Sequence, residues 1–130
     1  MKNKIYSLKD LSKIISKKKN NGKKITHCHG VFDLLHIGHI NHFKTSKNNG
    51  NILVVTITAD NYVKKGPNRP YFNENIRAEA LASLEIIDYV CINNSSTSIN
   101  AINELKPNFY CKGQDYSKSK DDLTGNILKE

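Results

Sequence analysis

The chain has 130 residues, of which 38% are hydrophobic and 25% are charged, values typical of one soluble globular domain. No stretch approaches the ~20 consecutive apolar residues of a membrane-spanning helix, and no apolar segment follows the basic N-terminal residues as it does in a secretory signal. These exclusions predict a cytoplasmic protein. Three cysteines without CxxC spacing are expected to be reduced core residues, namely Cys28, Cys91 and Cys111.

The formal net charge of +8 comes from the first 24 residues, which carry nine lysines and one acid, whereas the rest of the chain carries eleven basic and eleven acidic residues. A nucleic-acid-binding surface would combine basic residues with aromatic side chains for base stacking, and this segment contains only Tyr6. The run is therefore interpreted as the solvated face of a helix. Neither a nucleic acid nor a membrane is an expected partner.

Hydrophobic periodicity predicts helices and strands in alternation along the first half of the chain. Apolar residues at steps of three and four follow Ser7, a residue type that caps helices. A later segment is almost entirely aliphatic and β-branched, which is typical of a strand covered on both faces of a parallel sheet. The expected elements are a helix over 8–19, a strand over 25–32, a helix over 38–48 and a strand over 52–58.

The second half continues the alternation, with a helix over 73–84, a strand over 86–92, a helix over 97–105 and a strand over 109–111. Strands that alternate with helices of this length indicate βαβ units. The fold class is therefore predicted to be α/β and Rossmann-like, with a mainly parallel sheet and helices on both faces. We expect residues 1–24 to form an N-terminal basic helix and linker, and 25–130 to form the α/β domain.

In sheets of this kind, ligands bind beyond the carboxyl ends of the strands. All five histidines lie within sixteen residues around the first such end, at positions 27, 29, 36, 39 and 42. His36 and His39 flank Gly38 where the first strand gives way to a helix. The N–H groups of a first helical turn have no intrahelical partner and favour anions, and a glycine lets a ligand approach the backbone. The pattern favours a phosphate-binding turn.

Two other interpretations of the histidines remain open at this stage. His27 and His29 lie on the same side of a strand, and histidines there are commonly core residues with satisfied hydrogen bonds. His36, His39 and His42 are spaced at steps of three and could bind zinc from one side of a helix, although the chain lacks the usual i, i+4 pair with an adjacent glutamate.

Residues 30–39, Gly-Val-Phe-Asp-Leu-Leu-His-Ile-Gly-His, resemble the signature of the cytidylyltransferase-like nucleotidyltransferases. The resemblance extends to Asp60, the lysine loop 64–70, Arg77 and the segment 112–116, and covers nearly the whole chain from residue 8. Within the family the chain is most similar to the adenylyltransferase domain of bifunctional ADP-heptose synthases. It is more distantly similar to glycerol-3-phosphate cytidylyltransferase.

The resemblance implies nucleotidyl transfer: a sugar phosphate or polyol phosphate attacks the α-phosphorus of a nucleoside triphosphate, ATP or CTP, and pyrophosphate leaves. The family uses Mg²⁺ for this reaction. His36 and His39 would donate hydrogen bonds to the phosphates in the transition state, and the backbone of Val31 and Phe32 would face the α-phosphate. Asp33 is expected to orient local backbone or a histidine, because an attacking phosphate needs no general base.

Further residues are assigned to the site by the same resemblance. Lys64 and Lys65 would reach the substrate phosphates from a loop that closes over the triphosphate, unless that loop is simply solvated. Arg77 would contact a phosphate, or pair with an acid such as Glu74. The segment after the last strand would meet the nucleoside through Lys112, Gly113 and Asp115, or else it is a surface turn.

The chain departs from the family after Tyr116, where fourteen residues remain. Members normally continue into a further strand and a Ser/Thr-rich turn that opens a helix and holds the triphosphate. We therefore expect a domain truncated at its C-terminus, with a fused or partner sugar-kinase domain as in the bifunctional synthases, and a homodimer as is common in the family. The alternative to an enzyme is a non-catalytic nucleotide-binding or scaffolding module.

Overall fold

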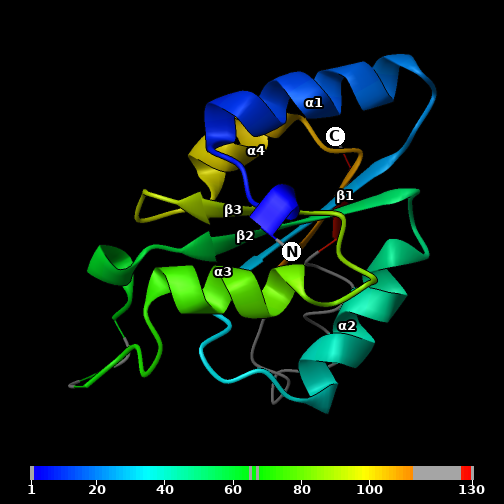
Figure 1. Cartoon of the computed structure of the whole chain (residues 1–130). Helices are drawn as coiled ribbons and strands as arrows, with labels where there is room; N and C mark the ends of the chain where they lie inside the picture. Colours follow the sequence, from blue (N-terminus) through cyan, green and yellow to red (C-terminus); the bar gives the residue numbers. More distant parts are fainter. Residues whose placement is uncertain (1, 65, 67, 113–126, 130) are drawn as a thin grey trace.

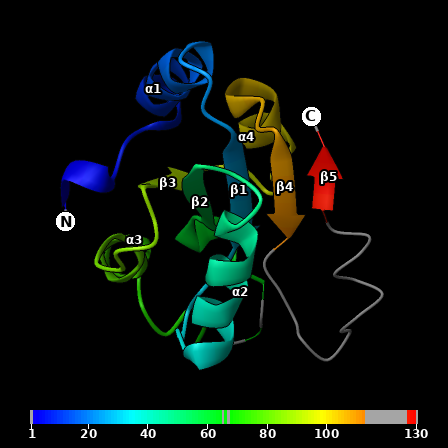
Figure 2. The same cartoon turned by 90° about the vertical axis from the view of Figure 1, so that its right-hand side faces the viewer.

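The computed structural model describes residues 2–64, 66, 68–112 and 127–129, and folds them into one sheet between two layers of helices (Figure 1). The described strands are β1 (Ile25–Gly30), β2 (Ile52–Thr58), β3 (Tyr89–Asn93), β4 (Phe109–Lys112) and β5 (Ile127–Lys129). They lie in the order β3-β2-β1-β4-β5, as Figure 2 shows. The first four are parallel and β5 is antiparallel to β4. The predicted Rossmann-like α/β class is confirmed.

Two helices cover each face of the sheet. α1 (Leu8–Asn20) and α4 (Ile99–Leu105) lie on one face, whereas α2 (Ile37–Lys47) and α3 (Glu74–Ala82) lie on the other (Figures 1 and 2). Two short 3-10 helices, η1 (Lys2–Lys4) and η2 (Asp60–Tyr62), complete the described elements. In these residues no helix has the length and apolar character needed to cross a bilayer.

α1 forms where the periodicity places it. The Ser7 hydroxyl accepts the Asp10 N–H at 3.2 Å, which satisfies one of the free amides of the first turn. Leu11 and Ile15 are fully buried against the sheet, while the lysines of the helix lie on its other faces. The helix ends before Gly22, whose φ of 86° is a left-handed conformation that glycine adopts without strain.

The central strands are buried on both faces, and their side chains alternate between two cores. One core lies under α2 and α3 and includes Cys28, Phe43, Leu53, Val55, Ile57, Leu81 and Cys111. The other lies under α1 and α4 and includes Leu11, Ile15, Ile25, Val54, Cys91 and Leu105. All three cysteines are buried free thiols, as the sequence predicts.

Two predicted strand boundaries are wrong. The first strand ends at Gly30 rather than at 32, because Phe32 has a φ of 50° that breaks the extended backbone. The third begins at Tyr89 rather than at 86, because residues 83–86 turn the chain after α3 and Asp88 then docks on β2. The Asp88 carboxylate accepts the Leu53 N–H at 2.8 Å and a hydrogen bond from Lys47 Nζ at 2.9 Å.

Candidate functional site

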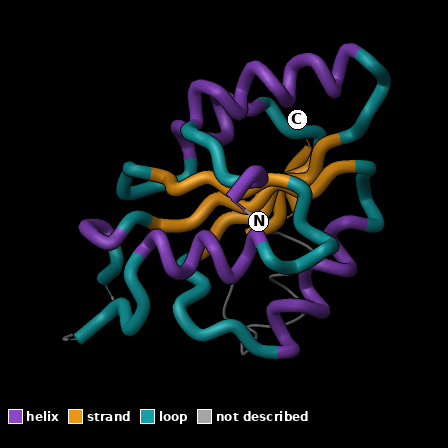
Figure 3. The backbone as a smooth tube through the Cα atoms, viewed as in Figure 1, coloured by secondary structure: helices purple, strands orange, loops and turns teal. Residues whose placement is uncertain are grey.

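The loops that follow β2 and β3 leave the sheet at the same end (Figure 3), which is the ligand-binding edge in parallel sheets. The segment after β1 reaches this edge as well, since β1 is parallel to and paired with β2 from Ile25 to Gly30. The polar residues of segment 31–39, of η2 and of the start of α3 are thereby brought into one region. The sequence predicts the same location for the site.

His36 and His39 open α2 and contact each other. His36 is the N-cap residue: its Nδ1 accepts the Gly38 N–H at 3.0 Å, and its own backbone N–H donates to His39 Nδ1 at 3.3 Å. The two rings lie with their centroids 4.0 Å apart and their planes at 37°. The structure therefore brings together the pair that the motif predicts, at the positive end of the α2 dipole.

This capping arrangement determines which nitrogen of each ring is the donor. An Nδ1 that accepts a backbone N–H presents its lone pair there, so in the neutral ring the hydrogen is on Nε2. His36 is exposed and His39 is half-buried. The pair can thus offer Nε2–H groups to an anion at the helix start, in the manner of positioned donors in phosphoryl-transfer sites.

Gly38 was expected to let a ligand approach the backbone, and its contact with a nucleotide stays a prediction. In the structure the Gly38 N–H donates to His36 Nδ1. The side chain of the cap residue therefore occupies the position that an anion would take at this amide. What Gly38 contributes in this structure is an amide that orients the His36 ring.

Val31 and Phe32 form a tight turn after β1. Phe32 has a positive φ of 50°, and its ring is buried against Phe43, with centroids 5.2 Å apart, and edge-on to His39 at 5.5 Å. A Cβ built on Gly30 would lie only 2.9 Å from Phe32 Cζ. Gly30 therefore permits the ring to fold back over β1 and to support His39.

Arg77 is the centre of a buried network, and only 1% of the residue is exposed. Its guanidinium donates to Val31 O at 2.9 Å, to Thr58 O at 2.8 Å and to Asp60 Oδ1 at 2.7 Å, and its Nε donates to Phe72 O at 2.9 Å. These partners come from the turn after β1, the end of β2 and the loop before α3.

The acid that pairs with Arg77 is therefore Asp60 and not Glu74, which instead accepts the Asp60 N–H at 2.8 Å. The Arg77 side chain has no exposed surface, so this structure gives it the role of a positioning residue. A direct contact between Arg77 and a bound phosphate stays a prediction, and it would require the network to open.

Asp33 joins the motif segment to the loop before α3. Its two carboxylate oxygens accept the Tyr71 N–H at 2.7 Å and the Phe72 N–H at 2.9 Å, and Arg69 Nη1 lies 3.7 Å from Oδ2. The prediction that Asp33 orients local backbone or a histidine is wrong in its partner, because these two amides belong to a segment about forty residues away. The sequence carries no spacing signal for this link.

His27 and His29 face the α1 and α4 side of the sheet and share one partner. His27 Nε2 and His29 Nδ1 each lie 2.7 Å from the Thr56 hydroxyl. Burial lowers the pKa of His27 to about 3, helped by the nearby His29, and burial lowers the pKa of His29 to about 4. Both rings are therefore neutral at pH 7; His27 is a fully buried core residue, whereas His29 is half-buried. Within the described chain, however, His27 Nδ1 is buried without a hydrogen-bond partner.

The zinc interpretation finds no support in the geometry. In the described ranges, no three His, Cys, Asp or Glu side chains gather as metal ligands. Burial lowers the pKa of His42, whose ring lies beside Phe43 with centroids 6.1 Å apart. Two carboxylates of the same region have partners already, since Asp33 accepts two backbone amides and Asp60 pairs with Arg77. The described residues therefore offer no three-ligand cluster for zinc, and the use of Mg²⁺ stays a prediction.

The remaining predicted site residues are only partly placed. Lys64 is exposed on the segment after η2. Lys112 is the last residue of β4, paired with His29, and its backbone reaches the same edge. Three predicted site residues lie outside the described residues, namely Lys65, Gly113 and Asp115. The segment directly after residue 116, where the family's further strand and Ser/Thr-rich turn would follow, lies outside them as well. Their roles stay predictions.

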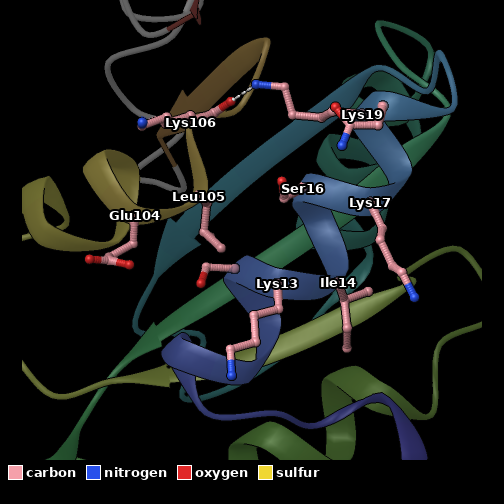
Figure 4. Close-up of a pocket in the computed structure, with 10 residues that line it drawn as sticks. Lys13, Ile14, Ser16, Lys17, Lys19, Glu104, Leu105 and Lys106 are labelled. Carbon is pink, nitrogen blue, oxygen red and sulfur yellow. Dashed lines mark hydrogen bonds between the residues drawn. The ribbon is translucent and has the colours of Figure 1, made fainter.

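A separate groove of about 900 Å³ lies between α1 and the C-terminal end of α4 (Figure 4). Lys13, Lys17 and Lys19 line it from α1, and Glu104 and Lys106 line it from the region of α4. The Lys19 ammonium donates to the Lys106 carbonyl. The groove belongs to the sheet face opposite to α2, so it is distinct from the histidine site.

An α/β domain that presents a pair of histidines at a helix start, beyond the ends of parallel strands, belongs to the class of domains that handle phosphate-bearing ligands. Comparison with known proteins makes the assignment specific. The family model described as cytidylyltransferase-like matches residues 27–127. The chain belongs to this family, as the motif residues predict.

Curated relatives and a solved structure agree with the family. The chain is 38% identical over 128 residues to the "Bifunctional protein HldE" of Aliarcobacter butzleri, and 42% identical over 116 residues to that of Geobacter metallireducens. These matches cover 97% and 88% of the chain but only 27% and 24% of the relatives, so the chain spans about a quarter of their length.

The fold is similar to a crystal structure of a lipopolysaccharide core biosynthesis protein from Thermoplasma volcanium, with a TM-score of 0.65 and 27% identity. The alignment covers 80% of this chain and 88% of that one. Nearly the whole of that protein is thus matched by the described α/β fold.

Proposed function

We propose that the domain is a nucleotidyltransferase that couples a nucleoside triphosphate to a sugar phosphate or a polyol phosphate. A phosphate oxygen of the acceptor attacks the α-phosphorus, the bond from that phosphorus to the oxygen bridging to the β-phosphate breaks, and pyrophosphate leaves. The observation that carries the proposal is the His36 and His39 pair, with Nδ1 of each ring held by a backbone amide. Family membership supports the same reaction.

The chain's residues would promote this reaction by position and electrostatics. Charge builds on the α-phosphate and on the leaving group, and the Nε2–H donors of His36 and His39 would stabilise it. The α2 dipole adds a fixed positive potential. Because the acceptor phosphate is already an anion at neutral pH, no side chain has to remove a proton from it.

The backbone around Val31 would bind the α-phosphate, and the Arg77 network would hold that turn in place. Lys64, Lys65 and Lys112 would contribute ammonium groups, and Gly113 and Asp115 would contact the nucleoside, as the family resemblance implies. Mg²⁺ would arrive bound to the triphosphate oxygens, since the ion commonly takes substrate phosphates and water as ligands. It would offset negative charge there.

The test is pyrophosphate release by the purified domain with ATP or CTP, MgCl₂ and a panel of sugar 1-phosphates and glycerol 3-phosphate. We expect release that depends on one nucleotide and one acceptor together. Release with no pair, from folded protein, would contradict the proposal.

A cap-preserving variant separates chemistry from helix stability. Asparagine is a good N-cap residue, so His36→Asn keeps the start of α2 but removes the imidazole Nε2–H. We expect turnover to fall about 10²-fold or more, as for the loss of one preorganised donor, while circular dichroism and the unfolding midpoint change little. Unchanged turnover in this variant would contradict the assignment of His36.

The second candidate is a nucleotide-binding or scaffolding module without turnover. If the domain is such a module, calorimetry should show that it binds ATP or CTP with a dissociation constant that His36→Asn barely changes. No pyrophosphate should be released. The protein is further proposed to act in the cytoplasm, as a homodimer, and beside a sugar-kinase domain that is fused or separate, since the relatives are named bifunctional and are about four times longer.

A further inference from the structure

Two of the three cysteines form a pair inside the sheet. Cys28 on β1 and Cys111 on β4 are direct register partners in two parallel strands, which lie side by side in Figure 2. Both belong to the core under α2 and α3, so their side chains stand on the same face of the sheet as a dithiol. The third, Cys91, lies in the core on the opposite face, separated by the sheet from this dithiol.

A hydroxyl group accompanies the dithiol and makes its two sulfurs unequal. Ser46, a buried residue near the end of α2, is within hydrogen-bonding reach of both thiols. The hydrogen bond with Cys28 lowers the pKa of the Cys111 thiol, while burial opposes this change and Ser46 adds to it. Its hydrogen bond to Cys111 and its burial raise the pKa of Cys28. Cys111 is therefore the sulfur that ionises first, and the thiolate is the nucleophilic form of cysteine.

The spacing of the dithiol is compatible with a disulfide. Neighbouring strands lie about 4.8 Å apart, and disulfides join Cα atoms that are about 4.4 to 6.8 Å apart. The Cβ atoms of a disulfide are closer together, at about 3.8 Å, so formation of the bond would draw β1 and β4 together at this pair. A disulfide that works against the sheet spacing is easier to reduce, and in reducing compartments such bonds are commonly transient and redox-sensing.

The dithiol lies directly behind the candidate site. The next register pair towards the ligand-binding edge consists of His29 and Lys112, and β1 ends one residue later, at Gly30, before the turn that begins with Val31. A covalent link between the two strands at the dithiol would therefore shift the strand ends from which this turn and Lys112 reach the site.

We propose that Cys28 and Cys111 are oxidised reversibly by a hydroperoxide to a disulfide, and that this disulfide weakens nucleotide binding at the candidate site. The Cys111 sulfur attacks a peroxide oxygen, the O–O bond breaks, and hydroxide leaves and takes up the thiol proton, so that a sulfenic acid and water are formed. The Cys28 sulfur then attacks the Cys111 sulfur, the S–O bond breaks, and a second water leaves with the Cys28 proton. Two thiols and one hydrogen peroxide thus give one disulfide and two waters: the sulfurs lose two electrons and the peroxide oxygens gain them.

Peptide mapping of the folded protein tests the bond. Reduced protein is treated with hydrogen peroxide under native conditions, alkylated, and cut with trypsin and a glutamate-specific protease, which places the three cysteines on peptides 25–44, 86–104 and 105–112. We expect a cross-link between 25–44 and 105–112 that dithiothreitol removes. The reaction should be slow, because local opening must expose the buried thiols. Three intact thiols, oxidation that stops at sulfenic or sulfinic acid, or cross-links mainly to 86–104 would each overturn the proposal.

Serine variants identify the two sulfurs. Cys28→Ser and Cys111→Ser should each abolish the cross-link. Cys91→Ser is the matched control, because Cys91 is as fully buried as Cys28 but lies in the other core, and burial raises its pKa to about 12; this variant should form the cross-link as wild type does. Circular dichroism checks that each variant is folded, and the mapping of wild type decides the question if one of them is not.

Calorimetry with ATP or CTP tests the effect of the bond on the site, and this half of the inference rests on the proposed function. We expect the disulfide form to bind nucleotide about fivefold or more weakly than the reduced form, the lower end of typical couplings between sites, with recovery after dithiothreitol and no loss in peroxide-treated Cys111→Ser. Equal affinity of the two forms would overturn the coupling. A cross-link in folded protein that binds neither nucleotide would contradict the proposed function and leave the disulfide assigned.

Discussion

Replacement of Arg77 by lysine provides a quantitative test of the network behind the site. Lysine keeps the charge but has a single nitrogen, so it cannot span the three carbonyl oxygens and the carboxylate that Arg77 contacts. At least two carbonyl acceptors then lose a charged donor in a buried place. Hydrogen bonds to charged groups contribute about 1.5 to 3 kcal/mol each, and because lysine keeps the charge beside Asp60, no further cost for a lost ion pair is added.

We therefore expect Arg77→Lys to lower the free energy of unfolding by about 3 kcal/mol, measured by urea denaturation followed by circular dichroism. Arg69→Lys is the control, because Arg69 is partly exposed and its nearest carboxylate oxygen is 3.7 Å away, and we expect a loss below about 1 kcal/mol. If Arg77→Lys proves as stable as wild type but binds nucleotide weakly, then Arg77 is a phosphate ligand and the reasoning from its burial is wrong.

Three more predictions follow from the geometry of the site. His39→Ala should lower the rate of pyrophosphate release about 10²- to 10³-fold, while loss of the hydrogen bond from the His36 N–H lowers the free energy of unfolding by only about 1 kcal/mol. Near-normal turnover would contradict the role of the pair. Folding lowers the pKa of His29 from 6.5 to about 4, so below pH 6.5 the unfolded chain binds more protons than the folded one. The free energy of unfolding should therefore fall as the pH decreases from about 6.5 toward 4, by up to about 1.4 kcal/mol per pH unit for one proton. Urea denaturation at several pH values in this range should show a weaker pH dependence of that free energy in His29→Asn. Gly30→Ala should lower the free energy of unfolding by about 1 to 3 kcal/mol, because the new Cβ would lie 2.9 Å from the Phe32 ring. If thermal denaturation gives this variant the same midpoint as wild type, the ring moves freely and the reasoning is wrong.

The sheet and its helices could be predicted because local pattern and tertiary burial agree in this chain. The aliphatic run 52–58 becomes a strand buried on both faces, and the capped, periodic segment 8–19 becomes α1. Strand boundaries were harder to predict, because the left-handed Phe32 and the turn at Asp88 depend on contacts made across the sheet. The antiparallel β5 at residues 127–129 was not predicted, since three residues carry too little periodicity.

More of the candidate site was predicted from the family motif than from physical reasoning about the individual residues. Proximity of His36 and His39 follows from their spacing at a helix start, but the use of Nδ1 as a cap does not, because histidine is not a common N-cap residue. The partner of Arg77 and the role of Asp33 join positions far apart in sequence, and one chain offers no signal for such pairs.

Because His36 both caps α2 and presents a hydrogen-bond donor, the order of the first turn of α2 is linked to the binding of a ligand there. One nitrogen completes the start of α2 and the other is offered outward, so fraying of that first turn would withdraw a donor and its anchoring amide together. An anion held there would in turn oppose fraying, and amide exchange at the beginning of α2 should slow when a nucleotide is bound. The helix start would thereby report occupancy as well as contribute binding energy.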